Sequence, residues 1–284
     1  VALDGDLSYD TGTHLARHLF PDRYIQAGIA EQDMVSTAGT LALSGYLPIV
    51  HSFATFLTMR ATEQIFNNAT EYSRIIYLGF LAGLVPSAPG FSHQAVTDVG
   101  IMSSIPGMRV FEPSCAMELR WALSQAQIHP GPSYIRMGGL SPTDEAQDGA
   151  AADSMVVRAP GEKVAFVSSG PLLTNAALEA RDALMETKGF HSAVYTIPEI
   201  TGSGLDLAAS VLSGYELIVI LENYNPALGK YTLLERALAT AGRSKVIRLG
   251  LEGIPANGQP AEVLAHHGLD VPSIVGAVAA SLGS

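Results

Sequence analysis

The stretch RYIQAGIAEQDMVSTAGTLALSGYLPIVHSFATFLTMRATEQIF, residues 23–66, decides the fold. Its first residues predict a strand that ends in a tight turn at Gly28, followed by a helix over residues 32–44. A second strand is predicted over residues 46–50. Strands that alternate with helices are typical of a parallel sheet covered by helices. Glu31 is therefore expected at a junction between a strand and a helix.

Two aromatic side chains follow the second predicted strand. Phe53 and Phe56 are three positions apart, so they share a face if this segment is helical. A carboxylate together with two flat rings is what a planar heteroaromatic base needs for binding. Each residue alone also fits a structural role, because the helix dipole favours a glutamate in the first turn and aromatic pairs are common in cores.

The motifs GIAEQDM and FATFLTM together resemble the pyrimidine-binding domain of transketolases and of the related deoxyxylulose-phosphate synthases. In that family the glutamate hydrogen-bonds a ring nitrogen of the aminopyrimidine of thiamine diphosphate, and the aromatic residues stack on that ring. The resemblance therefore implies a catalytic and cofactor-binding role for Glu31, and cofactor-binding roles for Phe53 and Phe56. The bond-making chemistry belongs to the cofactor.

Two further residues gain a role from the resemblance. The segment VALDGDLSYDTG, residues 1–12, is similar to the first strand and turn of the family domain, where an aspartate at the position of Asp6 lies near the cofactor and the subunit interface. The loop that ends in Ser-His-Gln resembles the family's G-x-x-T-H-Q loop, whose histidine contacts the reacting oxygens of the substrate. This implies a catalytic role for His93. By residue type alone, Asp6 fits a turn or cap and His93 a solvated loop group.

The order of predicted elements divides the chain into two α/β domains. Residues 1–140 form the pyrimidine-binding domain, a polar Pro/Asp/Ala/Gly run over 141–158 is the linker, and residues 159–284 form the second domain. Each domain is expected to contain a mainly parallel sheet covered by helices. The resemblance extends over nearly the whole chain, and the second domain resembles the C-terminal domain of transketolases.

Composition excludes several classes of protein. The chain has 284 residues, 48% of them hydrophobic and 15% charged, which argues against disorder. Its single cysteine, Cys115, excludes an internal disulfide and a cysteine-rich zinc site. A net charge of −11 disfavours nucleic-acid and anionic-membrane partners. Because no apolar run looks long enough to span a bilayer, we expect a cytoplasmic protein.

The sequence lacks one half of the expected cofactor site. The family binds Mg²⁺ and the diphosphate with a Gly-Asp-Gly motif that an Asn follows at a distance. Here Gly5 and Asp6 are followed by Leu7, so we expect no metal ligand from this chain. The resemblance then implies the C-terminal subunit of a split transketolase. An N-terminal partner would hold Mg²⁺ and the diphosphate, and the assembly would be a heterotetramer.

Departures from the family pattern concern the substrate. The arginine with which sugar-phosphate transketolases bind the phosphate aligns with Gly139, and a histidine and a serine align with Leu81 and Gly83. The acidic loop position aligns with Pro89. These changes remove polar groups, so we expect an acceptor that is not an ordinary aldose phosphate. Arg136 remains a candidate anion contact.

The predicted activity is transfer of a two-carbon ketol or acyl unit to an aldehyde-like acceptor. Two alternatives stay open at this point. The beta subunit of a 2-oxo acid dehydrogenase has the same two-domain organisation, and a non-catalytic regulatory partner of a complete enzyme would also carry this fold. Retention of Glu31, Phe53, Phe56 and His93 favours a catalytic subunit.

Overall fold

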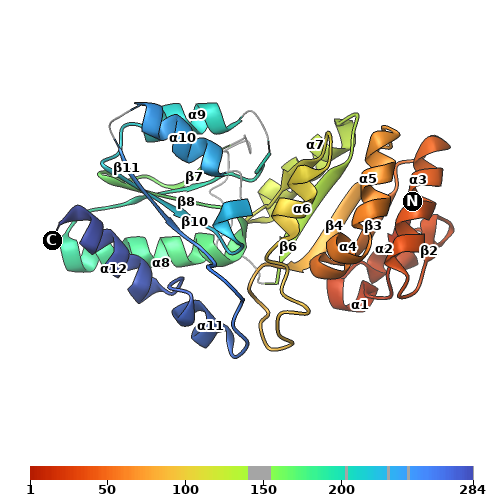
Figure 1. Cartoon of the computed structure of the whole chain (residues 1–284), viewed down its shortest axis with the longest axis horizontal. Coiled ribbons are helices and arrows are strands. Elements are labelled where there is room, and N and C mark those ends of the chain that lie inside the picture. Colours follow the sequence, from red (N-terminus) through yellow and green to blue (C-terminus); the bar gives the residue numbers. More distant parts are fainter. Residues whose placement is uncertain (140–154, 202–203, 229–230, 242–243, 284) are drawn as a thin grey trace.

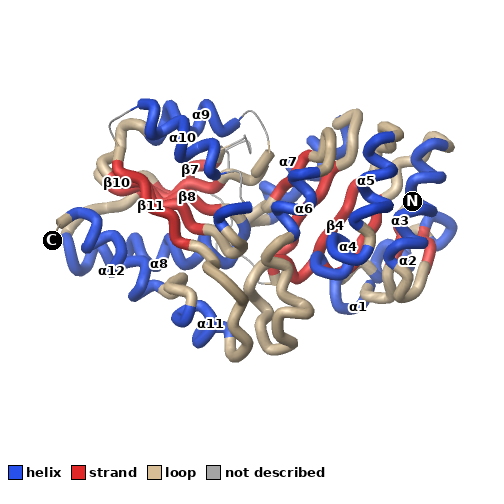
Figure 2. The backbone as a smooth tube through the Cα atoms, viewed as in Figure 1, coloured by secondary structure: helices blue, strands red, loops and turns tan. Residues whose placement is uncertain are grey.

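The computed structural model describes the chain except for residues 140–154, 202–203, 229–230, 242–243 and 284. Two α/β units lie side by side, and in each of them a central sheet is covered by helices (Figure 1, Figure 2). The predicted fold class, α/β with two mainly parallel sheets, is thereby confirmed.

The first sheet has six parallel strands in the order β2-β1-β3-β4-β6-β5. Its strands are β1 (Ala2–Asp4), β2 (Tyr24–Gln26), β3 (Ile49–Phe53), β4 (Ile76–Ala82), β5 (Arg109–Phe111) and β6 (Ser133–Gly138). The helical segments of this unit are α1 (Ser8–Thr11), α2 (His14–Leu19), η1 (Pro21–Arg23), α3 (Glu31–Leu43), α4 (Ala54–Arg60), α5 (Thr62–Thr70), α6 (Asp98–Ser104) and α7 (Ala116–Ile128).

The two faces of the first sheet build separate cores. Successive side chains of a strand point to opposite faces, so neighbouring residues enter different cores. Val50 of β3 and Tyr77 of β4 belong to a core shared with α3, α4, α5 and α6. On the opposite face, Ile76 and Ile135 pack with Ala122 of α7. The helices that follow β2 and β3 therefore lie on one face, and α7 lies on the other.

The second sheet has the order β11-β10-β8-β9-β7, in which β7 runs antiparallel to β9 and the other pairs are parallel. Its strands are β7 (Val156–Ala159), β8 (Val164–Ser168), β9 (Ala193–Thr196), β10 (Leu217–Leu221) and β11 (Lys245–Leu249). The helical segments are α8 (Gly170–Lys188), α9 (Gly204–Leu212), η2 (Pro226–Leu228), α10 (Tyr231–Ala241), α11 (Pro260–His266) and α12 (Val271–Leu282).

One strand boundary differs from the prediction in a way that affects the site. Strand β3 runs over Ile49–Phe53, whereas the sequence predicts residues 46–50. Pairing with β1 begins at Ile49, whose N–H donates to the carbonyl of Val1, and the preceding Pro48 has no N–H to extend the ladder toward β4. As a result Phe53 is the last residue of a strand and immediately precedes α4.

The predicted linker is shorter than residues 141–158. Val156 pairs with Thr196 of β9, so the second unit begins inside the predicted linker and before residue 159. Periodicity did not reveal this strand because β7 is an edge strand of only four residues, one of them exposed. Residues 141–154 of the linker lie outside the described residues.

One C-terminal segment differs from the expectation about membrane spans. Residues 260–282 are long and apolar enough to cross a membrane by length and composition. In the structure this segment consists of two helices, α11 and α12, with a turn between them that includes Gly268 at φ +67°. Val263, Ile274 and Val278 pack into the core of the second unit. Only 22% of the apolar window is buried inside the structure, so the absence of a membrane partner stays a prediction.

A buried arginine joins the two units. Arg136 of β6 has no solvent exposure. Its Nε donates to Asp98 Oδ2 at 2.8 Å, and its Nη1 donates to Glu112 Oε1 and to Asn223 Oδ1, each at 2.5 Å. Asn223 follows β10 in the second sheet, whereas Asp98 and Glu112 belong to the first unit. Because removing one partner of a buried ion pair typically costs about 3–5 kcal/mol, this network is a strong link between the units.

Two glycine-to-alanine substitutions test the helix packing. A Cβ at Gly39 of α3 would overlap with Oδ1 of Asn68 on α5, whereas a Cβ at Gly276 of α12 meets no atom within 4 Å. Gly39→Ala is expected to lower the free energy of unfolding by about 1–3 kcal/mol through overpacking. Gly276→Ala is expected to raise it by about 0.5–1 kcal/mol through helix propensity. Urea denaturation gives the change in the free energy of unfolding for each variant relative to the wild-type chain. Equal changes in the two variants would contradict this packing.

The pH dependence of stability tests the buried carboxyl group of Glu222. Burial raises the pKa of Glu222 from 4.5 to about 7, although Arg248 opposes the shift. Between these values the folded chain binds more protons than the unfolded chain, so its free energy of unfolding falls as the pH rises. We expect a loss of at most about 3 kcal/mol from pH 4.5 to 7.5, relative to the Glu222→Gln variant measured in parallel. Parallel pH curves for the two proteins would contradict the assignment.

Candidate active site

The predicted site residues gather at the carboxyl ends of β1, β2, β3 and β4. Asp6 follows β1, Glu31 follows β2, Phe53 ends β3, and His93 lies in the loop after β4. These strands are neighbours in the sheet, so their carboxyl ends meet along one edge. In open α/β sheets this edge is where ligands bind.

The backbone between β2 and α3 places the carboxyl group of Glu31 at a helix N-terminus. Gly28 takes a positive φ of +73° in the turn, and its N–H donates to Gln26 Oε1 at 3.0 Å. Glu31 then opens α3, so the helix dipole favours a negative charge there. Its side chain is 5% exposed and accepts a hydrogen bond from Arg60 Nη1 at 2.8 Å. The predicted helix thus begins one residue earlier than residue 32 and includes the glutamate.

Phe53, Phe56 and His93 form one aromatic cluster. The ring centroids of Phe53 and Phe56 are 5.6 Å apart, with 40° between the ring planes. The His93 imidazole lies 5.1 Å from the Phe56 ring and 6.3 Å from the Phe53 ring. The structure therefore brings together three residues that are up to forty positions apart in the sequence. All three are only half-buried, so ring surface remains accessible.

The loop that carries His93 is held from both sides. Ser92 Oγ lies 2.9 Å from His93 Nδ1, which orients the imidazole ring. The next residue, Gln94, is buried, and its Nε2 donates to the carbonyls of Leu84 and Ala256, each at 3.0 Å. Ala256 belongs to the second unit, so the position of His93 depends on both units.

Asp6 lies at the same sheet edge and is connected to the turn before Glu31. It has a positive φ of +67° and an exposed side chain. Gln26 Nε2 donates both to Asp6 Oδ1 at 3.2 Å and to Asp4 Oδ2 at 3.0 Å. Asp6 is therefore linked through Gln26 to Gly28, and its bonds do not reach the aromatic cluster.

Sequence reasoning missed two residues of this site, Arg60 and Gln26. The Arg60 guanidinium carbon lies 3.9 Å from the centroid of the Phe56 ring, while Nη1 of the same group binds Glu31. The available signal was the i,i+4 spacing from Phe56 to Arg60 on one helix, which places the guanidinium over the ring. Gln26 carried no comparable signal, because its role depends on contacts with two neighbouring segments.

The buried pair of Asp4 and His51 stabilises the ends of β1 and β3. Asp4 accepts hydrogen bonds from Tyr24 Oη at 2.5 Å and from the Leu7 N–H at 3.0 Å, and these bonds outweigh burial to lower the pKa of Asp4. Burial lowers the pKa of His51, whose Nε2 lies 3.4 Å from Asp4 Oδ1. Asp4 is thus charged and His51 neutral near pH 7. This arrangement fixes the strand ends that carry Asp6 and Phe53.

Gly139 is exposed, but two apolar side chains and the Val85 carbonyl lie close to the place that a Cβ atom would occupy. A Cβ at this position would lie 2.9 Å from Pro86 Cδ and 3.4 Å from Leu81 Cδ2. The candidate anion contact from Arg136 is not available, because its guanidinium is fully buried and pairs with Asp98 and Glu112. The prediction that Arg136 contacts a substrate anion is therefore wrong, because its charge is paired with carboxylates of the same chain.

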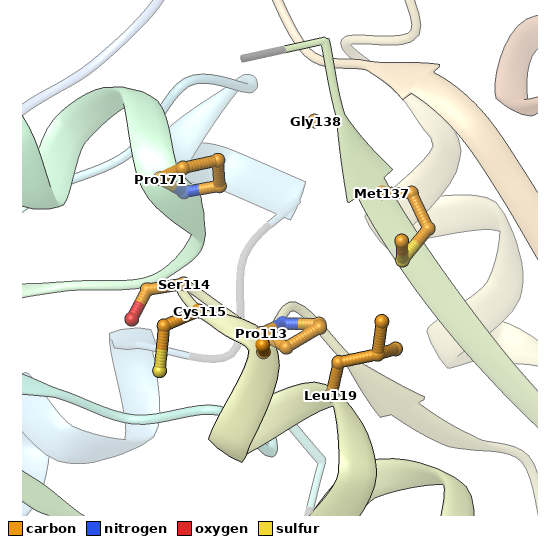
Figure 3. Close-up of a pocket in the computed structure, with 8 residues that line it drawn as sticks. Pro113, Ser114, Cys115, Leu119, Met137, Gly138 and Pro171 are labelled. Carbon is orange, nitrogen blue, oxygen red and sulfur yellow. The ribbon is translucent and has the colours of Figure 1, made fainter. Parts of the chain in front are cut away.

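A separate apolar cavity of about 220 Å³ lies between the units (Figure 3). Figure 3 shows Met137 and Gly138 of β6 on one side, with Ser114, Cys115 and Pro171 across the space. The predicted site residues do not line it. Among the described residues, no group of three or more His, Cys, Asp or Glu side chains could hold a metal ion.

Comparisons with known proteins agree with these features. Residues 1–139 match the pyrimidine-binding domain of transketolase. The chain is 30% identical over 265 residues to 1-deoxy-D-xylulose-5-phosphate synthase of Aromatoleum aromaticum. This match covers 91% of the chain but only 41% of the synthase. It is 28% identical over 266 residues to one of the subunits of the apulose-4-phosphate transketolase of Actinobacillus succinogenes, covering 90% of the chain and 84% of that protein.

A solved structure gives the same result for the fold. The inactive beta4 tetramer of a split-gene transketolase superposes on the whole chain with a TM-score of 0.85 and 28% identity, and the match covers 91% of that protein chain. The similarity thus includes the second unit as well as the pyrimidine-binding domain. Residues 1–139 are a transketolase pyrimidine-binding domain, and the whole chain is similar in sequence and fold to subunits of split transketolases.

Proposed function

We propose that this chain is the C-terminal subunit of a thiamine-diphosphate-dependent enzyme that transfers a two-carbon ketol or acyl unit to an aldehyde-like acceptor. One observation carries the proposal. A planar cationic group, the Arg60 guanidinium, stacks on Phe56 and donates a hydrogen bond to the buried carboxylate of Glu31. An aminopyrimidine would use the same ring face and the same carboxyl group, with its ring nitrogen sharing the proton of that group, so the residues present fit this half of the cofactor.

Each residue has a defined task in this proposal. When bound, thiamine diphosphate supplies the carbanion chemistry of the transfer. Glu31 holds or shares a proton at the pyrimidine ring nitrogen, and Phe53 and Phe56 fix the plane of that ring. His93, which lies against Phe56 and is oriented by Ser92, hydrogen-bonds substrate oxygen or transfers a proton to it. Asp6 contributes at the cofactor edge through its bond from Gln26.

We infer that a second chain completes the site. The apulose-4-phosphate transketolase subunit of Actinobacillus succinogenes is close to this chain in length, as shown by a match that covers 84% of that subunit. Thus an N-terminal partner of the transketolase type is proposed to bind the diphosphate and Mg²⁺. Two copies of each chain would form a heterotetramer with two sites at the interfaces between them. The proposed location of this assembly is the cytoplasm.

The acceptor is proposed to be an unphosphorylated or more apolar carbonyl compound. The position that aligns with the phosphate-binding arginine of the family is Gly139, where Pro86 leaves too little space even for a Cβ atom. Leu81 adds apolar surface beside it. Phosphate recognition needs Arg or Lys donors, and the nearby Arg136 is engaged by carboxylates.

Calorimetric titration tests the split cofactor site. Thiamine diphosphate with Mg²⁺ is titrated into this chain alone and into its mixture with a candidate N-terminal partner. Binding only in the mixture is expected, because each chain supplies half of the contacts. Equally tight binding by the chain alone would contradict the divided site, and no binding in either case would favour a non-catalytic regulatory subunit.

Proton exchange at the thiazolium carbon tests the role of Glu31 without knowledge of the substrate. In the assembled complex, Glu31→Gln is expected to slow exchange of this proton for deuterium by about 10²–10⁴-fold, because proton transfer by a positioned side chain is worth about this much. Quenched-flow proton NMR measures the rate. Glu63→Gln, which changes an exposed glutamate in the first turn of α5, is the matched control and should retain the wild-type rate.

A panel of acceptors tests the proposed substrate class. Turnover with aldose phosphates is expected to be at least about tenfold poorer than with unphosphorylated aldehydes of equal carbon number, because a phosphate beside apolar groups loses hydration without gaining a cationic partner. Values of kcat/KM for paired acceptors give this ratio. Efficient use of pentose phosphates would overturn the acceptor assignment, and transfer to a lipoyl carrier would favour a 2-oxo acid dehydrogenase beta subunit.

A further inference from the structure

We propose that Arg60 occupies the pyrimidine half-site of the cofactor-free chain and has to leave it when the cofactor binds. Arg60 would then be a built-in competitor that sets the affinity for thiamine diphosphate. This inference rests on the proposed function, since it concerns the residues assigned to the pyrimidine ring.

The contacts of Arg60 define the competition. Its Nη1 donates to Glu31 Oε1 at 2.8 Å, and its guanidinium carbon lies 3.9 Å from the Phe56 ring centroid. Arg60 is 45% exposed, whereas Glu31 is only 5% exposed. Arg60 therefore forms the solvent-facing cover over a buried carboxylate and over one face of an aromatic ring.

The guanidinium and an aminopyrimidine have the same recognition chemistry. Both are planar, both present N–H donors in the plane, and both stack on aromatic faces. One ring face of Phe56 accepts one stacked group, and an arginine at 3.9 Å leaves no space for a second ring between them. The two groups consequently exclude each other at this face.

The position of Arg60 allows it to move without refolding. It is the last residue of α4, and its carbonyl accepts a hydrogen bond from Gln32 Nε2 at 3.0 Å, which anchors the backbone. The long side chain is partly exposed and can rotate toward solvent while this backbone stays in place. Displacement therefore costs the ion pair and the stacking contact and leaves α4 intact.

The arrangement also serves the free subunit. A buried carboxylate without a partner is strongly destabilising, and Arg60 supplies the partner until a cofactor ring replaces it. Removing Arg60 should then have opposite effects on two properties. The free chain loses stability because Glu31 is left unpaired, whereas the assembled complex binds the cofactor more tightly.

The first experiment compares cofactor binding in assembled complexes. By calorimetry, the Kd for thiamine diphosphate with Mg²⁺ is expected to fall by about fivefold to thirtyfold in Arg60→Gln, the combined value of a half-exposed ion pair and a cation–π contact. Arg120→Gln removes the same charge from an exposed position on α7, on the opposite face of the sheet, and should leave Kd unchanged.

The second experiment is a double-mutant cycle on the free chain without cofactor. Arg60→Gln is expected to lower Tm, and the loss should be much smaller when Glu31→Gln is already present. Equal losses in both backgrounds would show that the two side chains do not interact, which overturns the inference.

The two experiments separate this inference from the proposed function. If the wild-type complex binds thiamine diphosphate and Arg60→Gln binds it equally or more weakly, Arg60 supports the cofactor instead of competing with it, and the inference is wrong alone. If the wild-type complex binds no thiamine diphosphate with any N-terminal partner, the proposed function fails and the inference fails with it.

Discussion

The guanidinium of Arg136 has no contact with solvent, so protein groups alone must neutralise its charge. A buried cation is tolerated only when carboxylates and further acceptors surround it, and here Asp98, Glu112, Asn223 and the Ala95 carbonyl do so. These groups come from both sheets and from the segment that follows the His93 loop. Charge neutralisation therefore fixes how the two units sit together and where the substrate-side loop ends.

The active-site edge depends on that fixed arrangement. The His93 loop is held by Gln94, which binds a carbonyl of the second unit, and by Ala95, which binds Arg136. His93 then lies against Phe56, and Arg60 connects the same ring with Glu31. The second unit thus contributes to the site by supporting the loop, although the residues assigned to the cofactor all belong to the first unit.

Local patterns were sufficient to predict the α/β class, the turn at Gly28, and the positions of Glu31, Phe53 and Phe56 beside a strand end. They failed where a feature depends on distant partners. The edge strand β7 is recognised only through its pairing with β9, and the fate of Arg136 depends on acceptors 24 to 87 positions away in the sequence. Arg60 was overlooked because an arginine at the end of a helix usually faces solvent. Here the buried carboxylate of Glu31 and the Phe56 ring hold it over the site.

The bond between Arg136 and Asn223 also limits how such a chain can change during evolution. Recombination that exchanges one domain for that of a homologue preserves each hydrophobic core, but it brings together an arginine and a loop that were selected in different proteins. Unless the incoming loop presents an acceptor at the same place, a charged donor remains unsatisfied in the interior. The hydrogen bond therefore couples the two domains, which are not freely interchangeable modules even though their sheets are separate.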